Sequence, residues 1–177
     1  MSVVIRIGEG GRERGVTMKV LIAYGSKMGG TVGLAEMLGE DLEADGIDVS
    51  VHPAGAVGDI DGYDAVIVGG ALYATRWHKD ARRFVKRHAD ALRQKDVWLF
   101  SSGPLDDSAL AGEIPPVRFV RKTLASVGAR GHITFGGRMP ADPKGFPASS
   151  MAKDNAGDWR DRDQVRHWAK KISEDLT

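Results

Sequence analysis

The sequence predicts an α/β fold: a doubly wound, five-stranded parallel sheet in a three-layer arrangement. Apolar runs that suit buried strands recur along the chain, at residues 19–24, 47–52, 64–69, 97–101 and 132–135. Stretches with helical periodicity separate these runs, and strands that alternate with helices form a parallel sheet covered on both faces. Ligands of such sheets bind beyond the carboxyl ends of the strands, where we expect the functional site.

The first two predicted helices differ in character. The first begins just after Gly30 and ends at Gly46, and it buries leucines that are four residues apart: Leu34, Leu38 and Leu42. The second is strongly amphipathic, with an apolar stripe of Ala81, Phe84, Val85, His88 and Leu92. Its opposite face is basic and carries Lys79, Arg82, Arg83, Lys86, Arg87 and Arg93. We expect His88 to be a core histidine, because it shares the apolar stripe.

Two more helices complete the predicted domain. Pro115 and Pro116 open a third helix that ends before Gly128, because proline suits the first helical turn and glycine the position after the last. The last helix docks the carboxyl terminus through Val165, Trp168, Ala169, Ile172 and Leu176. Between them, residues 136–158 hold three of the seven prolines and no helical period, which predicts a long binding loop.

We expect residues 18–177 to form a single domain. Residues 1–17 mix a short apolar run with Gly, Arg and Glu. They are expected to be a flexible tail, or to stem from a start codon placed upstream of the native one.

The composition excludes several classes of protein. With 42% hydrophobic and 28% charged residues the chain is of globular type, and no apolar run approaches the roughly 20 residues that span a bilayer. It has no cysteine, which excludes disulfides, thiolate zinc sites, iron–sulfur clusters and thiol nucleophiles. The net charge of +1 gives no reason to expect a nucleic-acid partner. The amino terminus lacks a secretory pattern, so we expect a cytoplasmic protein, including a peripheral position at the inner membrane face.

The turn after the first strand carries the strongest functional signal. Residues 25–31 read Gly-Ser-Lys-Met-Gly-Gly-Thr and directly precede a predicted helix. Backbone N–H groups at a helix start converge beside the positive end of the helix dipole, and glycines allow close approach. Ser26 and Thr31 add hydroxyl donors. The turn therefore predicts a phosphate site, with a tight connection that binds nothing as the alternative.

Three phosphate-binding templates compete for this turn. The triphosphatase pattern G-x-x-x-x-G-K-[ST] finds Thr31 where its lysine belongs. The dinucleotide pattern G-x-G-x-x-G starts at Gly8 and finds Glu13 in place of its third glycine. The third template, [ST]-x-[ST]-G-x-T, is matched from Ser26 to Thr31 except at Met28. This last match resembles the phosphate loop of flavodoxins.

The resemblance to the flavodoxin family extends over residues 18–176. It is closest to the flavodoxin-type menaquinone-dependent protoporphyrinogen oxidases, which share the YD-x-V-x-x-G start, the aromatic–His pair and the FVK-x-H helix of residues 63–92. Three further segments occupy positions equivalent to segments of these oxidases: FSSGPL (100–105), FGGRMP (135–140) and the closing DWRDRDQVRHWA. The resemblance implies a flavodoxin-like sheet and bound FMN. It implies less about substrate, because residues 138–158 are short and polar where these oxidases carry a longer apolar insertion.

By resemblance, three loops hold the cofactor. The first holds the phosphate: Ser26, Lys27, Met28, Gly29, Gly30 and Thr31. The second places Trp77 or Tyr73 against the isoalloxazine and comprises Leu72, Tyr73, Ala74, Thr75, Arg76 and Trp77. The third meets the pyrimidine edge: Ser102, Gly103, Pro104 and Leu105. No side chain need act as an acid or base, because the flavin carries the redox chemistry.

Histidines add little to this site. His78 is a speculative addition, placed to hydrogen-bond a quinone or a porphyrin carboxylate, with a surface position at the helix start as the alternative. His52, His132 and His167 are scattered without ligand spacing, so no metal site is predicted.

Two functions stay open, with a third from another class. The first is an FMN-dependent oxidoreductase of dehydrogenase or oxidase type, acting on a small redox substrate and linked to protoporphyrinogen or a quinone. The alternative is a flavodoxin electron carrier between redox proteins, and the third is a flavin-free binding module. Carrier flavodoxins resemble one another in being strongly acidic, whereas this chain has a net charge of +1, which favours the oxidoreductase modestly. The basic helix predicts an anionic partner, namely a carboxylated substrate, an acidic protein or an anionic membrane surface, with a merely solvated face as the alternative.

Overall fold

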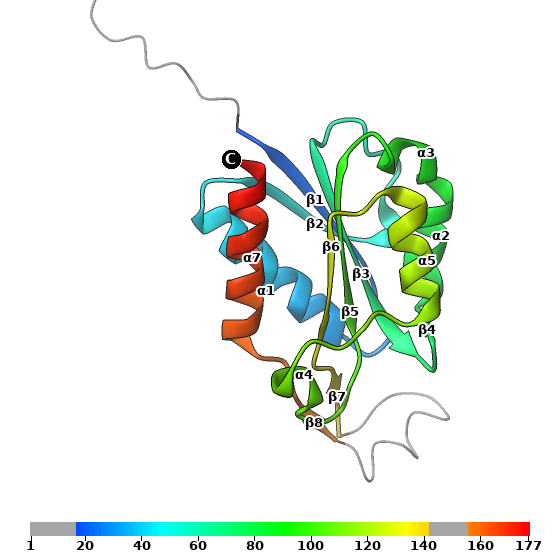
Figure 1. Ribbon diagram of the computed structural model, residues 1–177, viewed down its shortest axis with the longest axis vertical. Helices are drawn as coiled ribbons and strands as arrows, with labels where there is room; N and C mark the ends of the chain where they lie inside the picture. Colours follow the sequence, from blue (N-terminus) through cyan, green and yellow to red (C-terminus); the bar gives the residue numbers. More distant parts are fainter. Residues whose placement is uncertain (1–16, 142–155) are drawn as a thin grey trace, which may run out of the picture.

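The computed structural model describes residues 17–141 and 156–177, in which a parallel sheet separates two layers of helices (Figure 1). The strand order is β2-β1-β3-β5-β6, and all four pairings along this path are parallel. The strands are β1 (Lys19–Gly25), β2 (Asp48–Pro53), β3 (Ala65–Tyr73), β5 (Asp96–Ser102) and β6 (Gly131–Phe135). The predicted five-stranded, doubly wound sheet is confirmed.

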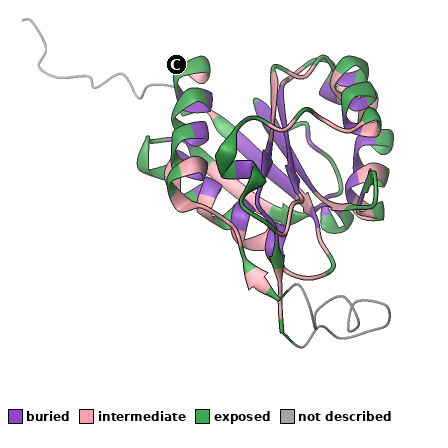
Figure 2. Ribbon diagram, turned by 60° about the horizontal axis from the view of Figure 1, so that its bottom comes forward, coloured by how far each residue is buried: buried purple, intermediate pink, exposed green. Residues whose placement is uncertain are grey.

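The central strands form because they are apolar on both faces. In β1, residues 20–23 are fully buried, and they pair in register with Ala65, Val66, Ile67 and Val68 of β3. Alternate side chains enter two separate cores, so Ile22 packs with Leu34 on one face and Leu21 packs with Phe84 on the other. Figure 2 shows the sheet as the most continuously buried part of the fold.

Helices cover both faces of the sheet. One layer contains α1 (Gly30–Ala44) and α7 (Arg162–Leu176), and the other contains α2 (Lys79–Arg87), α3 (Ala89–Leu92) and α5 (Arg118–Val127) (Figure 1). Shorter elements are η1 (Ala54–Ala56) after β2, β4 (Arg76–Trp77), α4 (Ser108–Ala111), β7 (Arg138–Met139) and β8 (Gly157–Asp158). β4, α4, β7 and β8 gather at the lower end of the sheet in Figure 1, where the parallel strands end.

Two helices differ from their predicted bounds. The second predicted helix is divided at His88, whose φ of −104° interrupts the helical path between α2 and α3. His88 is 9% exposed and its ring stacks near Phe84, so the core-histidine prediction is confirmed. The third helix begins at Arg118 rather than at Pro115, because a residue followed by proline is driven out of the helical region.

The long loop predicted for residues 136–158 contains a short antiparallel pair. β7 and β8 are hydrogen-bonded partners, with Arg138 opposite Asp158 and Met139 opposite Gly157. The intervening residues 142–155 lie outside the described residues, as do residues 1–16 of the predicted tail. Within the described ranges, no helix is long and apolar enough to cross a membrane.

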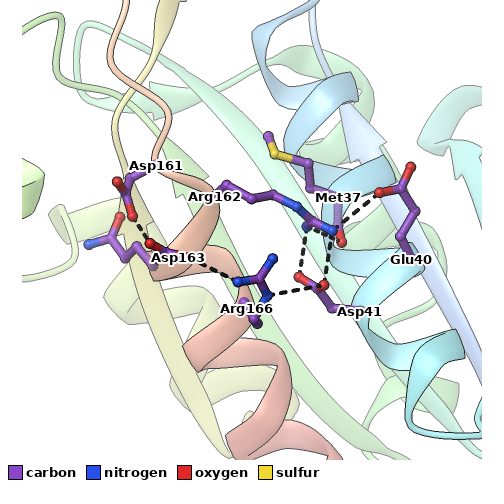
Figure 3. Close-up of polar contacts among 8 residues, drawn as sticks. Met37, Glu40, Asp41, Asp161, Arg162, Asp163 and Arg166 are labelled. Atoms are coloured by element: carbon purple, nitrogen blue, oxygen red, sulfur yellow. Dashed lines mark hydrogen bonds and ion pairs between the residues drawn. The ribbon is translucent and has the colours of Figure 1, made fainter.

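An arginine joins the start of α7 to α1 (Figure 3). Arg162 Nη1 donates to the Met37 carbonyl at 2.8 Å and to Asp41 Oδ2 at 2.7 Å, while its Nη2 donates to Asp41 Oδ1 at 2.9 Å. Asp161 caps the same helix by accepting from the Gln164 backbone N–H at 2.6 Å. Because two parallel bonds fix the guanidinium, the chain that enters α7 is held beside α1.

Candidate functional site

A pocket of about 490 Å³ opens at the carboxyl ends of the strands. The three predicted loops meet there, as the topology of a doubly wound sheet requires. Its lining comprises Ser26, Lys27, Met28, Gly30, Thr31, Ala71, Leu72, Tyr73, Ala74, Ser102, Gly103, Leu105, Gly137, Arg138 and Met139.

The first loop presents unsatisfied donors to this pocket. Gly29 is the N-cap of α1, with φ of 80°, and no side chain caps the helix. The first-turn N–H groups of α1 are therefore left for solvent or a ligand. The Ser26 hydroxyl is used within the loop, where its Oγ accepts from the Gly29 N–H at 3.1 Å.

Thr31 gives the clearest sign of a polar ligand. Its side chain is 0% exposed, and Oγ1 has no hydrogen-bond partner among the residues that the structure describes. A buried hydroxyl without a partner costs about 1–3 kcal/mol, and native structures rarely keep one without a reason. The hydroxyl, the free helix N–H groups and Lys27 form a donor set that fits a phosphate. Met28 lines the same wall and adds no polar side-chain atom.

Tyr73 connects the second loop to the first. It stands at the end of β3, and its hydroxyl accepts from the Lys27 backbone N–H at 3.2 Å. Burial raises the pKa of Tyr73, opposed by the hydrogen bonds from the backbone of Lys27 and Met28. The ring is 39% exposed at the pocket, so one face is available to a flat ligand ring. Ala74 follows with a left-handed φ of 55°, which turns the chain into β4.

Trp77 lies elsewhere, which corrects one of the two aromatic assignments. Its indole is 1% exposed within the core cluster beneath α2 and α5, edge-on to Phe119. A Cβ on Gly70 would lie 2.3 Å from its Cγ, so the indole occupies the space that this glycine leaves open. The cause is β4, which pairs antiparallel with β3 and directs the side chain into the core. Tyr73 is the aromatic residue of this hairpin at the pocket.

The other predicted site residues fall into three groups: those that line the pocket, those that are exposed in the β3–β4 turn, and those that contribute through the backbone. Eleven named above line the pocket, while Thr75 and Arg76 lie exposed in the β3–β4 turn. Gly29 contributes as the helix cap, and Pro104 contributes through its carbonyl, which accepts from the Gly137 N–H at 2.8 Å. The sequence analysis did not assign Ala71, Gly137, Arg138 or Met139. Gly137, Arg138 and Met139 belong to the FGGRMP segment at the end of β6, which was the available signal, whereas Ala71 lies inside β3 and no motif marks it.

His78 is a helix cap outside the pocket lining. Its Nδ1 accepts from the Asp80 N–H at 3.3 Å, and the Asp80 carboxylate lies 3.7 Å away. Burial lowers the pKa of His78, opposed mainly by Asp80. Nothing in this arrangement gives the imidazole a role in catalysis. Among residues 17–141 and 156–177, no group of three or more acidic or histidine side chains can hold a metal ion.

A buried hydrogen-bonded chain lies behind the pocket. Trp77 Nε1–H donates to Ser101 Oγ at 2.9 Å, and that oxygen lies 3.0 Å from His132 Nε2. Burial lowers the pKa of His132 to about 4. His132 is therefore neutral at physiological pH, with Nε2 free to accept the Ser101 hydroxyl proton.

The titration of His132 predicts an acid-sensitive fold. At pH values between about 4, the pKa of His132 in the folded protein, and its ordinary pKa of 6.5, His132 is protonated in the unfolded chain and neutral in the folded chain. Stability should therefore fall as the pH drops through this window, by up to roughly 3 kcal/mol. His132→Gln should flatten this part of the profile, measured as the urea midpoint of apoprotein from pH 7 to pH 4. Parallel profiles for parent and variant would exclude His132 as the source.

Comparisons with known proteins agree with this fold. Residues 21–139 match the flavodoxin domain family. A flavodoxin from the domain Archaea superposes with a TM-score of 0.61 at 17% identity, covering 90% of this chain and 99% of that one. Flavodoxin 2 from Bacillus cereus gives 0.59 at 20% identity, covering 89% and 99%.

One longer protein contains a similar unit. Rubredoxin oxygen:oxidoreductase from the anaerobe Desulfovibrio gigas superposes with a TM-score of 0.64 at 17% identity, over 89% of this chain. The match spans 36% of that protein. At these identities the structural matches establish the fold.

Proposed function

The chain belongs to the flavodoxin domain family, and from this premise we propose that it binds FMN in the 490 Å³ pocket and transfers electrons as a carrier between redox proteins. The observation that carries the proposal is the buried, unpartnered Thr31 hydroxyl beside the uncapped start of α1. These donors are of the kind that a phosphate monoester satisfies.

Each loop has a distinct role in this proposal. Residues 26–31 hold the phosphate through the α1 N–H groups and the Thr31 hydroxyl. Tyr73 covers one face of the ring system, and residues 102–105 border its other edge with backbone groups and Leu105. FMN supplies the redox chemistry, since its ring accepts and releases electrons singly or in pairs. The protein's part is to position the ring and to set its electrostatic environment.

The carrier role is supported by the similarity to flavodoxins that this chain covers over nearly their full length. A second candidate is an FMN-dependent oxidoreductase that acts on a small redox substrate, a quinone or protoporphyrinogen. It is favoured by the cationic side chains beside the pocket and by the resemblance of residues 63–92 to menaquinone-dependent protoporphyrinogen oxidases. The two candidates differ in what accepts the electrons.

Purification and a visible spectrum test the shared part of the proposal. The holoprotein should be yellow and release FMN on denaturation, whereas a colourless protein that takes up no FMN would refute it. Reduced holoprotein should then pass electrons to a protein acceptor, without steady turnover of protoporphyrinogen in the presence of menadione. Steady turnover of protoporphyrinogen would contradict the carrier role and support the oxidoreductase role.

The basic face of the second predicted helix is smaller in the structure than in the sequence. Arg87 Nη2 donates to the Ala54 carbonyl at 3.4 Å and to the Val57 carbonyl at 3.1 Å, and Arg93 pairs with Asp90. The Arg82 Nε is buried. Arg87 stays exposed and keeps its charge, and the exposed cations of α2 that have no hydrogen bond among the described residues are Lys79, Arg83 and Lys86.

These three cations predict a salt-dependent reaction with an anionic partner. Exposed charges are screened over roughly 8–10 Å at physiological salt, so attraction of an acidic protein or an anionic membrane should weaken as salt rises. Changing Lys79, Arg83 and Lys86 to Gln should flatten the salt dependence of electron transfer to an acidic ferredoxin. Lys170→Gln with Lys171→Gln, on α7 in the opposite layer, is the control. Equal salt profiles for all three proteins would make α2 a solvated face only.

A further inference from the structure

The β7–β8 pair brings an unassigned basic residue to the phosphate loop. A Cβ on Gly30 would lie 3.2 Å from the Arg138 backbone N and 3.3 Å from the Arg138 Cβ. Arg138 lines the main pocket together with Ser26 and Thr31. It also lines the adjoining hollow outside the start of α1. Arg138 therefore lies beside Gly30 in the first turn of α1, at the junction of the two hollows.

The carboxylate nearest in register to Arg138 is already engaged. Asp158 accepts from Arg160 Nε at 2.8 Å and from Arg160 Nη2 at 2.6 Å, and these hydrogen bonds lower the pKa of Asp158. Arg160 Nη1 also donates to the Gly30 carbonyl at 3.4 Å, which ties the pair to α1. The guanidinium of Arg160 is thus engaged by the Asp158 carboxylate and the Gly30 carbonyl.

Arg138 differs from Arg160 in this respect. Its side chain is exposed and forms no ion pair within 4 Å in the two described ranges, although its charge helps to lower the pKa of Asp158. Its strand position is nevertheless fixed, because β7 pairs with β8 and the Gly137 N–H donates to the Pro104 carbonyl. The backbone that carries the Arg138 side chain is therefore fixed beside the phosphate loop.

Charge balance indicates what this residue does. A phosphate monoester carries about −1.5 to −2 at neutral pH, and a helix N-terminus contributes about +0.5. A cation beside the loop would add to this attraction. Lys27 offers a single compact charge from within the loop. A guanidinium can bind two phosphate oxygens at once.

We propose that Arg138 is the countercharge of the phosphate bound at residues 26–31, and that it thereby makes the site selective for FMN over riboflavin. This inference rests on the proposed FMN function. It assigns the short β7–β8 pair a binding role, since the pair carries this charge to the start of α1.

The test compares Arg138→Gln with Arg121→Gln, a matched charge change at an exposed position of α5 outside the pocket lining. Apoprotein is titrated with FMN and with riboflavin, followed by flavin fluorescence, at low and high salt. Arg138→Gln should weaken FMN about 10-fold at low salt, and less at high salt, while the riboflavin Kd changes less than about 2-fold. Arg138→Lys should recover part of the loss, and Arg121→Gln should leave both Kd values within about 2-fold.

Two results would overturn the inference. Equal weakening of FMN and riboflavin would mean that Arg138 supports the pocket without meeting the phosphate. If the parent prefers FMN and Arg138→Gln binds FMN with an unchanged Kd, Arg138 is not the countercharge. The proposed function would be unaffected by that result. A parent that binds neither flavin would overturn the proposed function as well.

Discussion

Trp77→Ala should lower the free energy of unfolding by about 3–5 kcal/mol, the usual cost of deleting a large core aromatic side chain. The indole is buried over Gly70 and its Nε1–H is bonded to Ser101, so the substitution leaves a cavity and removes one of the two hydrogen bonds of the Ser101 hydroxyl. The measurement is urea unfolding of the apoprotein. Flavin fluorescence in the surviving holoprotein should stay as quenched as in the parent.

Tyr73→Ala is the matched control from the same hairpin. Because Tyr73 is half-buried at the pocket, its loss should brighten bound flavin and change the unfolding midpoint much less than Trp77→Ala does. The opposite pattern, a stable Trp77→Ala protein with bright flavin, would mean that the indole packs on the isoalloxazine as the sequence resemblance implies.

Thr31→Val should weaken FMN binding by about 1.5–3 kcal/mol, roughly 10- to 150-fold in Kd. Valine replaces the buried hydroxyl with a methyl group of similar size. The apoprotein should lose no stability, because the hydroxyl has no partner to lose. Isothermal titration with FMN measures the affinity, and thermal unfolding of apoprotein measures the stability.

Thr75→Val is the control for this substitution, since Thr75 lies exposed in the β3–β4 turn outside the pocket lining. It should leave the FMN Kd unchanged. If Thr31→Val binds FMN as tightly as the parent while its apoprotein unfolds earlier, the Thr31 hydroxyl serves the fold and not the ligand.

The parts of this fold that the sequence predicts are those set by local pattern. Residues 20–23 are apolar on both faces of β1, a pattern that requires a sheet covered on both sides. The phosphate loop is also local, because a glycine-rich turn and the following helix lie within a few residues. Gly128, with φ of 64°, ends α5 where the sequence predicts.

The parts that the sequence misses depend on pairings between distant or very short segments. β4 has two residues and therefore no detectable period, yet its pairing with β3 decides that Trp77 points into the core. The FGGRMP motif marks the segment that contains Arg138, but the β7–β8 pairing that fixes its backbone joins Arg138 to Asp158, twenty positions further along the chain. The break at His88, where φ is −104°, lies in a stretch whose apolar stripe continues from α2 into α3, so the side-chain pattern does not reveal it.

Titration of the apoprotein with FMN and riboflavin tests the central claim most directly. The two ligands share the ring system and differ in the phosphate, so the ratio of their Kd values isolates what residues 26–31 contribute. FMN should bind at least about 100-fold more tightly, since several charge-assisted hydrogen bonds are involved. Equal affinity for both ligands would contradict the account, because the uncapped start of α1 and the Thr31 hydroxyl would then contribute nothing to binding.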